Sequence, residues 1–191
     1  MTETDKRTRD VVDVLTDDHR EVTDLINQIR TADDADRRRD LADIVITELV
    51  RHAVAEEMHV YPVMRKHLAD GEEAVQHDIK EHKAIERTLK ELEDVPASDP
   101  RFAALIDQLA TILDDHIRDE EMEQFPKLRA QVPRDKLVEL AEKVETAKKL
   151  APTHPHPNAP NNALFHKVVG PGVGFVDRLR DKLSAHTTSR D

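Results

Sequence analysis

The 191-residue sequence has no cysteine, no tryptophan, a single tyrosine and only four glycines. The absence of cysteine excludes disulfide bonds, thiolate zinc sites, cysteine-ligated iron–sulfur clusters and a cysteine nucleophile. No apolar run approaches the roughly 20 residues that a membrane span requires, so we expect no membrane partner. The polar N-terminal segment lacks the pattern of a secretory signal, and we therefore expect a cytoplasmic protein.

Charged residues make up 36% of the sequence, and its abundant alanine, leucine, glutamate and arginine favour helices over strands. Apolar residues recur at spacings of three and four in five stretches, which begin near residues 8, 36, 72, 100 and 134. This pattern predicts an all-α fold, an up-down-up-down four-helix bundle with an additional C-terminal helix. The formal charge of −11 disfavours nucleic acid as the main partner.

Punctuating residues predict where these helices bend and end. We expect Pro62 to bend the second helix or loosen its last turns, and Asp70 with Gly71 to end it. Ser98 or Asp99 is expected to cap the start of the fourth helix.

The composition changes after residue 150, where a Pro/His/Gly-rich segment begins. We therefore expect two regions, a helical metal-binding bundle over 1–150 and an extension over 151–191 that includes a short amphipathic helix from Phe175 to Leu183. His154 and His156 are interpreted as part of a solvated linker rather than as metal ligands. The sequence leaves the oligomeric state open between monomer and dimer.

A weak internal repeat organises the bundle. His52 and His116 each precede a glutamate by four residues, which places both side chains on one helix face. The surrounding EEMHVYP (56–62) and EEMEQFP (120–126) also align. His19 precedes His52 by 33 residues, and His82 precedes His116 by 34. We expect the two halves of this repeat to fold against each other and to share a metal site.

Six residues of the repeat lie on helix faces that are otherwise apolar: His19, His52, Glu56, His82, His116 and Glu120. A single histidine in such a position is usually a hydrogen-bonded core residue, but a buried carboxylate has to be paired or bound to a metal. Imidazole and carboxylate ligands suit iron, manganese or zinc, and six of them exceed one tetrahedral zinc site. The pattern predicts two metal ions bridged by Glu56 and Glu120, with open positions for a small ligand.

The same residues, with an acid before the first histidine of each half (Asp18 and Glu81), resemble the hemerythrin-like HHE cation-binding family over about residues 10–130. The C-terminal extension is similar to that of actinobacterial members. This resemblance implies a non-haem di-iron centre inside a hemerythrin-like bundle, with an oxo or hydroxo bridge between the irons. It also implies that the four histidines are terminal ligands and the two glutamates are bridging ligands, with zinc or manganese as substitutes for iron.

The sequence departs from the oxygen-carrying members of that family on its third helix. Those members have a second histidine four residues before the one that corresponds to His82, where this sequence has Asp78. Glu86 stands four residues after His82, and Asp78, Glu86 or Tyr61 is expected to compensate for the missing imidazole. His59 and His67 are expected to lie beyond the site.

Three functions remain open at this point. The departure favours a di-iron protein that binds or reacts with peroxide, oxygen or nitric oxide, with weak catalase-like or peroxidase-like activity in oxidative or nitrosative stress. The alternatives are an iron or oxygen sensor or store without turnover, and a metal-free helical interaction module. Whether the protein is an enzyme is left open by the sequence.

Overall fold

The structure is a computed structural model, and it describes residues 9–151, 153 and 154. The short helix expected from Phe175 to Leu183 lies outside the described residues. The helical segments are, in chain order, α2 (Val11–Thr31), α3 (Ala35–Ala55), η1 (Glu56–Val60), α4 (Tyr61–His67), α5 (Gly71–Glu93), α6 (Pro100–Asp119), η2 (Glu120–Gln124), α7 (Phe125–Gln131) and α8 (Arg134–Leu150).

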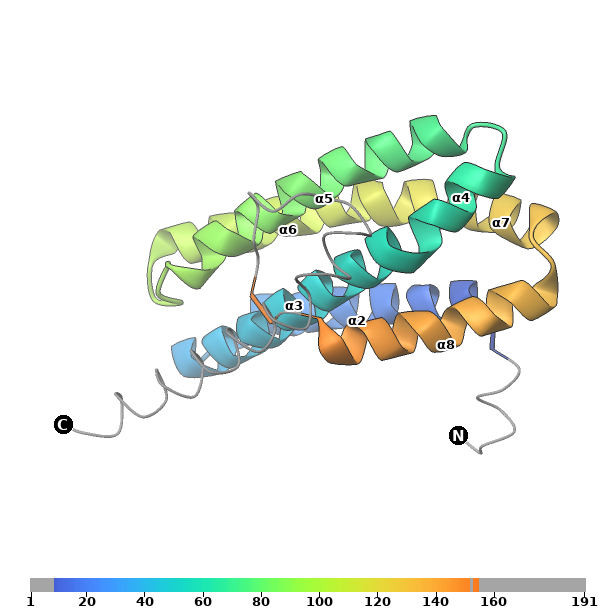
Figure 1. The fold of residues 1–191 in the computed structure, drawn as a ribbon. Helices are drawn as coiled ribbons and strands as arrows, with labels where there is room; N and C mark the ends of the chain where they lie inside the picture. The colour runs from blue at the N-terminus through green and yellow to red at the C-terminus, as the bar shows by residue number, and fades with distance from the viewer. Residues whose placement is uncertain (1–8, 152, 155–191) are drawn as a thin grey trace.

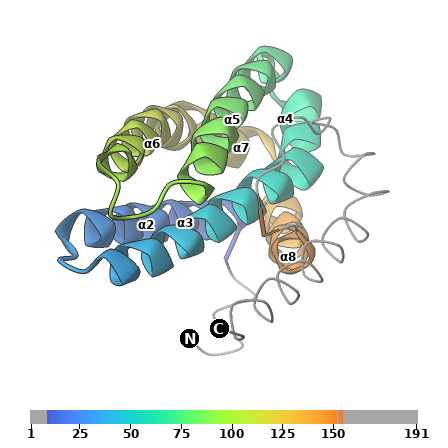
Figure 2. The same ribbon diagram turned by 90° about the vertical axis from the view of Figure 1, so that its left-hand side faces the viewer.

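The long helices form two antiparallel pairs, α2 with α3 and α5 with α6, which pack on each other as a four-helix bundle (Figure 1). The fifth helix, α8, lies along α2 and α3, on the far side from α5 and α6 (Figure 2). The prediction of an all-α bundle with an additional C-terminal helix is thus confirmed. None of the helices within the described residues is both long and apolar enough to cross a membrane.

Two π-helical turns, η1 and η2, carry α3 into α4 and α6 into α7. Pro62 and Pro126 stand at the start of α4 and α7, where a proline ring would clash with the carbonyl group four residues earlier in a regular α-helix. The wider π turn accommodates each ring, and the Tyr61 N–H donates to the carbonyl oxygen of Glu56, five residues back. Pro62 predicted where the helix would be irregular, but the sequence did not show that the irregularity would be a π turn.

The helix ends follow local chemistry, with one correction to the sequence analysis. Asp99 caps α6, and its side chain accepts a 2.8 Å hydrogen bond from the backbone N–H of Arg101, as expected. The expectation that Gly71 ends the second helix is wrong, because α4 ends at His67 and Gly71 begins α5. A side chain at Gly71 would collide with the carbonyl oxygen of Met64, so a glycine permits the close approach of α4 and α5.

The apolar core consists of two clusters separated by a polar layer. One cluster gathers around Val22, Leu49 and the inner faces of α5 and α6. The other contains Leu15, Ala55 and the α8 residues, including Leu137, Leu140 and Val144. On α2 and α3, His19 and His52 stand between members of the two clusters. The fold therefore closes the polar layer with apolar packing on both sides.

The chain after α8 stays on the bundle for a few residues. Ala151 is buried, and His154 forms an ion pair with Glu93 at the end of α5. The interpretation of His154 as part of a solvated linker is therefore corrected, because that side chain is partly buried and paired. His156 lies outside the described residues.

Candidate metal centre

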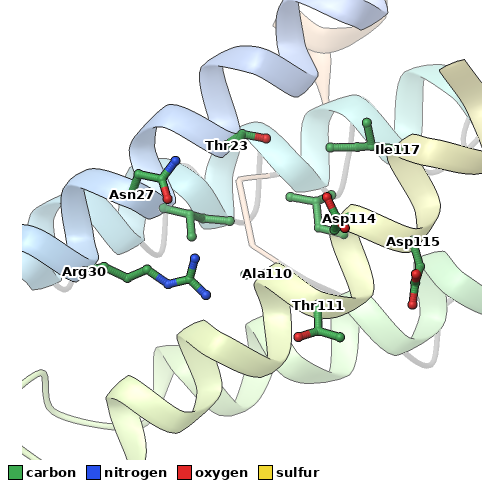
Figure 3. Close-up of a pocket in the computed structure, with 10 residues that line it drawn as sticks. Thr23, Asn27, Arg30, Ala110, Thr111, Asp114, Asp115 and Ile117 are labelled. Carbon is green, nitrogen blue, oxygen red and sulfur yellow. The ribbon is translucent and has the colours of Figure 1, made fainter.

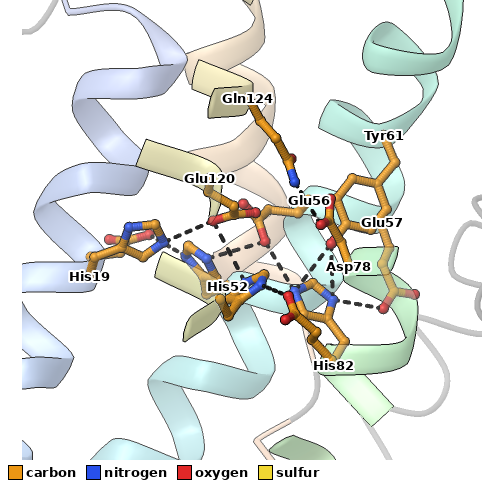
Figure 4. A network of polar contacts seen from close by, with 12 residues as sticks. His19, His52, Glu56, Glu57, Tyr61, Asp78, His82, Glu120 and Gln124 are labelled. Carbon is orange, nitrogen blue, oxygen red and sulfur yellow. Dashed lines mark hydrogen bonds and ion pairs between the residues drawn. The ribbon is translucent and has the colours of Figure 1, made fainter. Parts of the chain in front are cut away.

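Each of the four long helices places one histidine in the polar layer. His19, His52, His82 and His116 come from α2, α3, α5 and α6, and each is at most 5% exposed. Their rings form two pairs, with ring centroids 5.0 Å apart for His19 and His52 and 4.9 Å apart for His82 and His116. The apolar faces of the helices thus converge on a compact group of imidazoles (Figure 4).

Two glutamates connect these pairs. Oε2 of Glu56 lies 3.2 Å from Nε2 of His52 and 3.4 Å from Nε2 of His82. Oε2 of Glu120 lies 3.2 Å from Nε2 of His19 and 3.6 Å from Nε2 of His116. Each carboxylate therefore spans one histidine of each pair, as a ligand that bridges two metal ions would. The structure brings together all six residues that the sequence predicted.

Several atoms of this group are buried without a hydrogen-bond partner among the described residues. They are Nε2 of His19, His52 and His116, both side-chain oxygens of Glu56, and Oε2 of Glu120. The contacts described above are ion pairs and not hydrogen bonds. Buried polar groups are normally hydrogen-bonded. A group of nitrogen and oxygen atoms that face one another without hydrogen bonds therefore fits the ligand set of a bound cation. Ligand atoms of His52, Glu56, His116 and Glu120 all lie within 4.8 Å of one another.

A second set of carboxylates faces the Nδ1 atoms of these histidines. Nδ1 and the nearest carboxylate oxygen are separated by 2.9 Å for His19 and Glu121, 3.3 Å for His52 and Asp18, 3.2 Å for His82 and Glu57, and 2.9 Å for His116 and Glu81. An Nδ1–H that donates to a carboxylate fixes the tautomer whose Nε2 lone pair is free to bind a metal. All four imidazoles are thereby oriented toward the centre.

These four orienting carboxylates follow the repeat, although the sequence analysis did not assign them a role. The acid before the first histidine of each half, Asp18 or Glu81, contacts the second histidine of the same half. The glutamate after the bridging glutamate, Glu57 or Glu121, contacts the first histidine of the other half. The doubled glutamates of the EEM segments were the signal that could have identified them.

The shifted pKa values of the site residues show that the centre favours bound positive charge. Burial alone would lower the pKa of His52, but the negative charge of Glu56, with the hydrogen bond and charge of Asp18, outweighs it and raises that pKa to about 10. Burial would raise the pKa of Glu56, but His52 and His82 hold it well below its usual value. The pKa of His82 is raised by Glu56 and Glu57 in spite of burial. Without a metal, protons on His52 and His82 offset the negative charge of the carboxylates, and a bound cation would displace them.

The surroundings of the centre differ between the two halves. Phe125 stacks on His19, with ring centroids 5.8 Å apart. At the matching position of the other half, Tyr61 stacks on His82, and its hydroxyl lies 3.2 Å from Nε2 of that ring. Burial, followed by the negative charges of Glu56 and nearby acids, raises the pKa of Tyr61 well above its usual value, so its hydroxyl stays protonated.

A buried acid completes this polar end. Asp78 is fully buried, its Oδ1 accepts a 2.7 Å hydrogen bond from Nε2 of Gln124, and its Oδ2 is unpartnered among the described residues. Burial and the charge of Glu120 raise the pKa of Asp78 to about 7. Of the three residues expected to compensate for the missing imidazole, Asp78 and Tyr61 thus lie at the centre. Glu86 is only partly buried and falls outside the candidate metal-binding groups of the described residues.

The surface pocket between α2 and α6 is separate from this centre (Figure 3). It has a volume of about 320 Å³ and is lined by Thr23, Asn27, Arg30, Thr111 and neighbouring side chains. None of the six candidate ligands is among its lining residues. His59 is partly buried and His67 is exposed, and both lie outside the candidate groups in the described part of the chain.

Comparison with known proteins gives consistent matches. The model of the hemerythrin HHE cation-binding domain matches residues 10–128. An uncharacterised hemerythrin-like protein from Schizosaccharomyces pombe is 33% identical over 179 residues, which cover 93% of this chain and 88% of that protein. A DNA nickase from Nostoc sp. is 28% identical over 144 residues, which cover 75% of this chain but only 40% of the nickase.

A solved structure shares the fold. The crystal structure of a hemerythrin HHE cation-binding domain-containing protein from Mycobacterium kansasii aligns with a TM-score of 0.64 at 23% sequence identity. The alignment covers 74% of this chain and 86% of that one.

Proposed function

Because the chain belongs to the hemerythrin HHE cation-binding domain family, we propose that its six inward-facing residues hold two iron ions, and that this centre reacts with a small oxidant, above all hydrogen peroxide. The observation that carries the proposal is the position of Glu56 and Glu120, each between one histidine of each pair. Iron, rather than zinc or manganese, is inferred from the family. When bound, a pair of iron ions supplies the electrons that are exchanged with the oxidant.

The polar end of the centre favours peroxide chemistry over oxygen carriage. Asp78 stands where an oxygen carrier has an imidazole, and carboxylate surroundings favour the ferric state over the ferrous state that carriage requires. Reduction of one peroxide to two waters consumes two protons, and oxidation of a second peroxide to dioxygen returns them. Oδ2 of Asp78, with a pKa of about 7, and the hydroxyl of Tyr61 can hold such protons inside the centre.

The test compares oxygen evolution from hydrogen peroxide by the iron-loaded protein with that by the zinc-loaded protein. Zinc occupies similar ligands but has no redox chemistry, so it is a control for the fold and for adventitious reactions. We expect turnover with iron, none with zinc, and no reversible uptake of dioxygen by the reduced protein. Reversible oxygen uptake without peroxide consumption would instead assign the protein to the oxygen carriers.

A sensing or storage role is the second candidate, and the segment after α8 favours it. Ala151 and His154 hold this segment against the bundle, and His154 contacts the end of α5, the helix that carries His82. A metal-dependent shift of α5 would therefore alter the contact between Glu93 and His154. Limited proteolysis with and without iron tests this role, since an identical cleavage pattern in the two states would remove it.

Other partners and the location are also part of the proposal. We propose a small diatomic or peroxide molecule as the ligand and a cytoplasmic location, in agreement with the expectations from the sequence. DNA nicking is named only for the Nostoc protein, and the charge of −11 gives no support for a nucleic-acid partner here. The buried nitrogen and oxygen atoms of the centre that lack a hydrogen-bond partner among the described residues argue against a metal-free interaction module.

A further inference from the structure

The two halves of the repeat differ in the second partner of the acid that orients each half's second histidine. Asp18 lies beneath α8, and its Oδ1 forms a 2.6 Å ion pair with Lys148 of that helix. Its counterpart Glu81 lies on α5, away from α8 (Figure 2). Oε1 of Glu81 is instead 3.2 Å from Nε2 of His77, one turn earlier on the same helix. The acid beside His52 is therefore paired with a lysine, and the equivalent acid beside His116 is paired with an imidazole.

His77 completes a group of metal-ligand type at the surface of α5 and α6. Its Nε2 is also 3.3 Å from Oδ2 of Asp119 on α6, and ligand atoms of His77, Glu81 and Asp119 all lie within 4.8 Å of one another. The His77 side chain is 53% exposed, that of Asp119 40% and that of Glu81 16%. One imidazole and two carboxylates, two of the three side chains accessible to water, form a ligand set suited to a hydrated divalent ion.

A second group continues from this one into the interior. Glu81 also belongs, with Asp78 and His116, to a set whose ligand atoms all lie within 4.8 Å of one another. Oε2 of Glu81 is 2.9 Å from Nδ1 of His116, and the unpartnered Oδ2 of Asp78 is a buried acceptor with no hydrogen bond in the described part of the chain. His116 in turn belongs to the central set with His52, Glu56 and Glu120. The set at the surface shares Glu81 with the intermediate set, and the intermediate set shares His116 with the central one.

We propose that His77, Glu81 and Asp119 form a capture site for a divalent metal ion, which then passes by way of Asp78 to the buried centre. The proposal rests on the two-metal centre proposed above. Its physical reason is that an ion cannot cross the apolar clusters on either side of the centre without losing all its ligands at once. As the ion moves from one set to the next, its water ligands are replaced by protein ligands a few at a time, and the ion becomes more buried.

The test measures the rate of metal uptake rather than the activity of the loaded protein. The double variant His77→Ala/Asp119→Asn removes two capture ligands but retains Glu81, which also orients His116. Metal-free protein is mixed anaerobically with Fe²⁺, and the iron left in solution is trapped at timed intervals with a chromogenic chelator. We expect initial uptake to slow by about tenfold or more, since charged clefts raise association rates by such factors. The final iron content should stay at that of the unmodified protein.

The double variant His67→Ala/Asp24→Asn is the matched control. It makes the same chemical changes at two exposed positions outside the candidate metal groups of the described residues, and its uptake should match that of the unmodified protein. Equal uptake rates for the capture-site variant and this control would overturn the proposal. Loss of iron at equilibrium would also overturn it, because His77 or Asp119 would then belong to the centre itself. An unmodified protein that takes up no iron would instead count against the proposed function.

A second readout detects the capture site directly. When the centre is filled with zinc, added Mn²⁺ should broaden the NMR signals of the His77 imidazole in a saturable manner. In the Asp119→Asn variant, which keeps the His77 imidazole, the broadening should no longer saturate, while the control variant should retain saturable broadening. Absence of saturable broadening in the unmodified protein would contradict the capture site.

Discussion

Asp78 accepts a 2.7 Å hydrogen bond from Gln124 in the interior of the bundle. In the other half of the repeat, the positions that match these two residues are occupied by Leu15 and Val60, both buried in the apolar cluster beside the centre. The six candidate ligands are therefore related by an approximate two-fold repeat, but their surroundings are not. One end of the centre is apolar, and the other carries an acid and an amide, which is why we place proton transfer at that end.

Substitution of Asp78 tests this difference. Asp78→Asn keeps an oxygen that can accept the hydrogen bond from Gln124 but cannot hold the proton, so peroxide turnover should fall by about 10²-fold. The iron content should remain unchanged, because the six ligands are retained. Glu86→Gln, on the same helix but outside the candidate groups of the described residues, is the matched control and should keep full turnover. Equal turnover in the two variants would exclude Asp78 as a proton donor.

The orienting carboxylates should contribute to metal affinity without binding the metal. Glu121→Ala removes the partner of Nδ1 of His19 and should weaken metal binding by about 10-fold to 100-fold, as is typical for partners of metal-ligating histidines. Glu123→Ala removes a nearby exposed carboxylate, and its affinity should match that of the unmodified protein. Competition with a chelator of known affinity measures both, and a similar loss in the two variants would indicate a general effect of charge.

Metal binding should release protons at neutral pH. The pKa of His52 in the metal-free fold is about 10, so its imidazole carries a proton at pH 7 that a metal ion has to displace. Calorimetric titrations in two buffers with different ionisation enthalpies should therefore give different apparent heats, and the apparent affinity should rise with pH toward 10. Identical heats in the two buffers would show that the imidazole of His52 is already neutral at this pH.

The same pKa has a consequence for the metal-free protein. Because the folded-state pKa lies above the ordinary value of 6.5, the protonated imidazole stabilises the fold below that value. This contribution is lost as the pH rises through about 10. The midpoint of thermal unfolding of the metal-free protein should accordingly fall over this range, and a midpoint that rises would contradict the charge balance described above.

The helices and the six candidate ligands could be predicted from the sequence because both depend on spacing along the chain. Apolar residues every three or four positions define the bundle, and the four-residue offset between His52 and Glu56 survives in the structure as a 3.2 Å approach. The cap at Asp99 was predictable for the same reason, since it depends on residues two positions apart.

The features of the fold and of the site that the sequence did not predict depend on contacts between distant segments or on irregular backbone. The partner of His19 is Glu121, 102 residues away, and no spacing rule connects them. The π turn at η1 adds width to one turn, which lets Val60 and Tyr61 both face the interior, and a search with a fixed period of 3.6 residues cannot find it. Gly71 was misassigned because a glycine after a helix usually marks its end, whereas here it serves the close approach of α4 and α5.

The central claim, that two metal ions are bridged by Glu56 and Glu120, is tested most directly by metal content. Iron per chain is measured after anaerobic loading for the unmodified protein and for Glu56→Ala and Glu120→Ala, with His59→Ala as a control outside the centre. We predict two irons per chain for the unmodified protein and the control, and at most one for each glutamate variant. Two irons per chain in both glutamate variants would contradict the bridging roles and the account built on them.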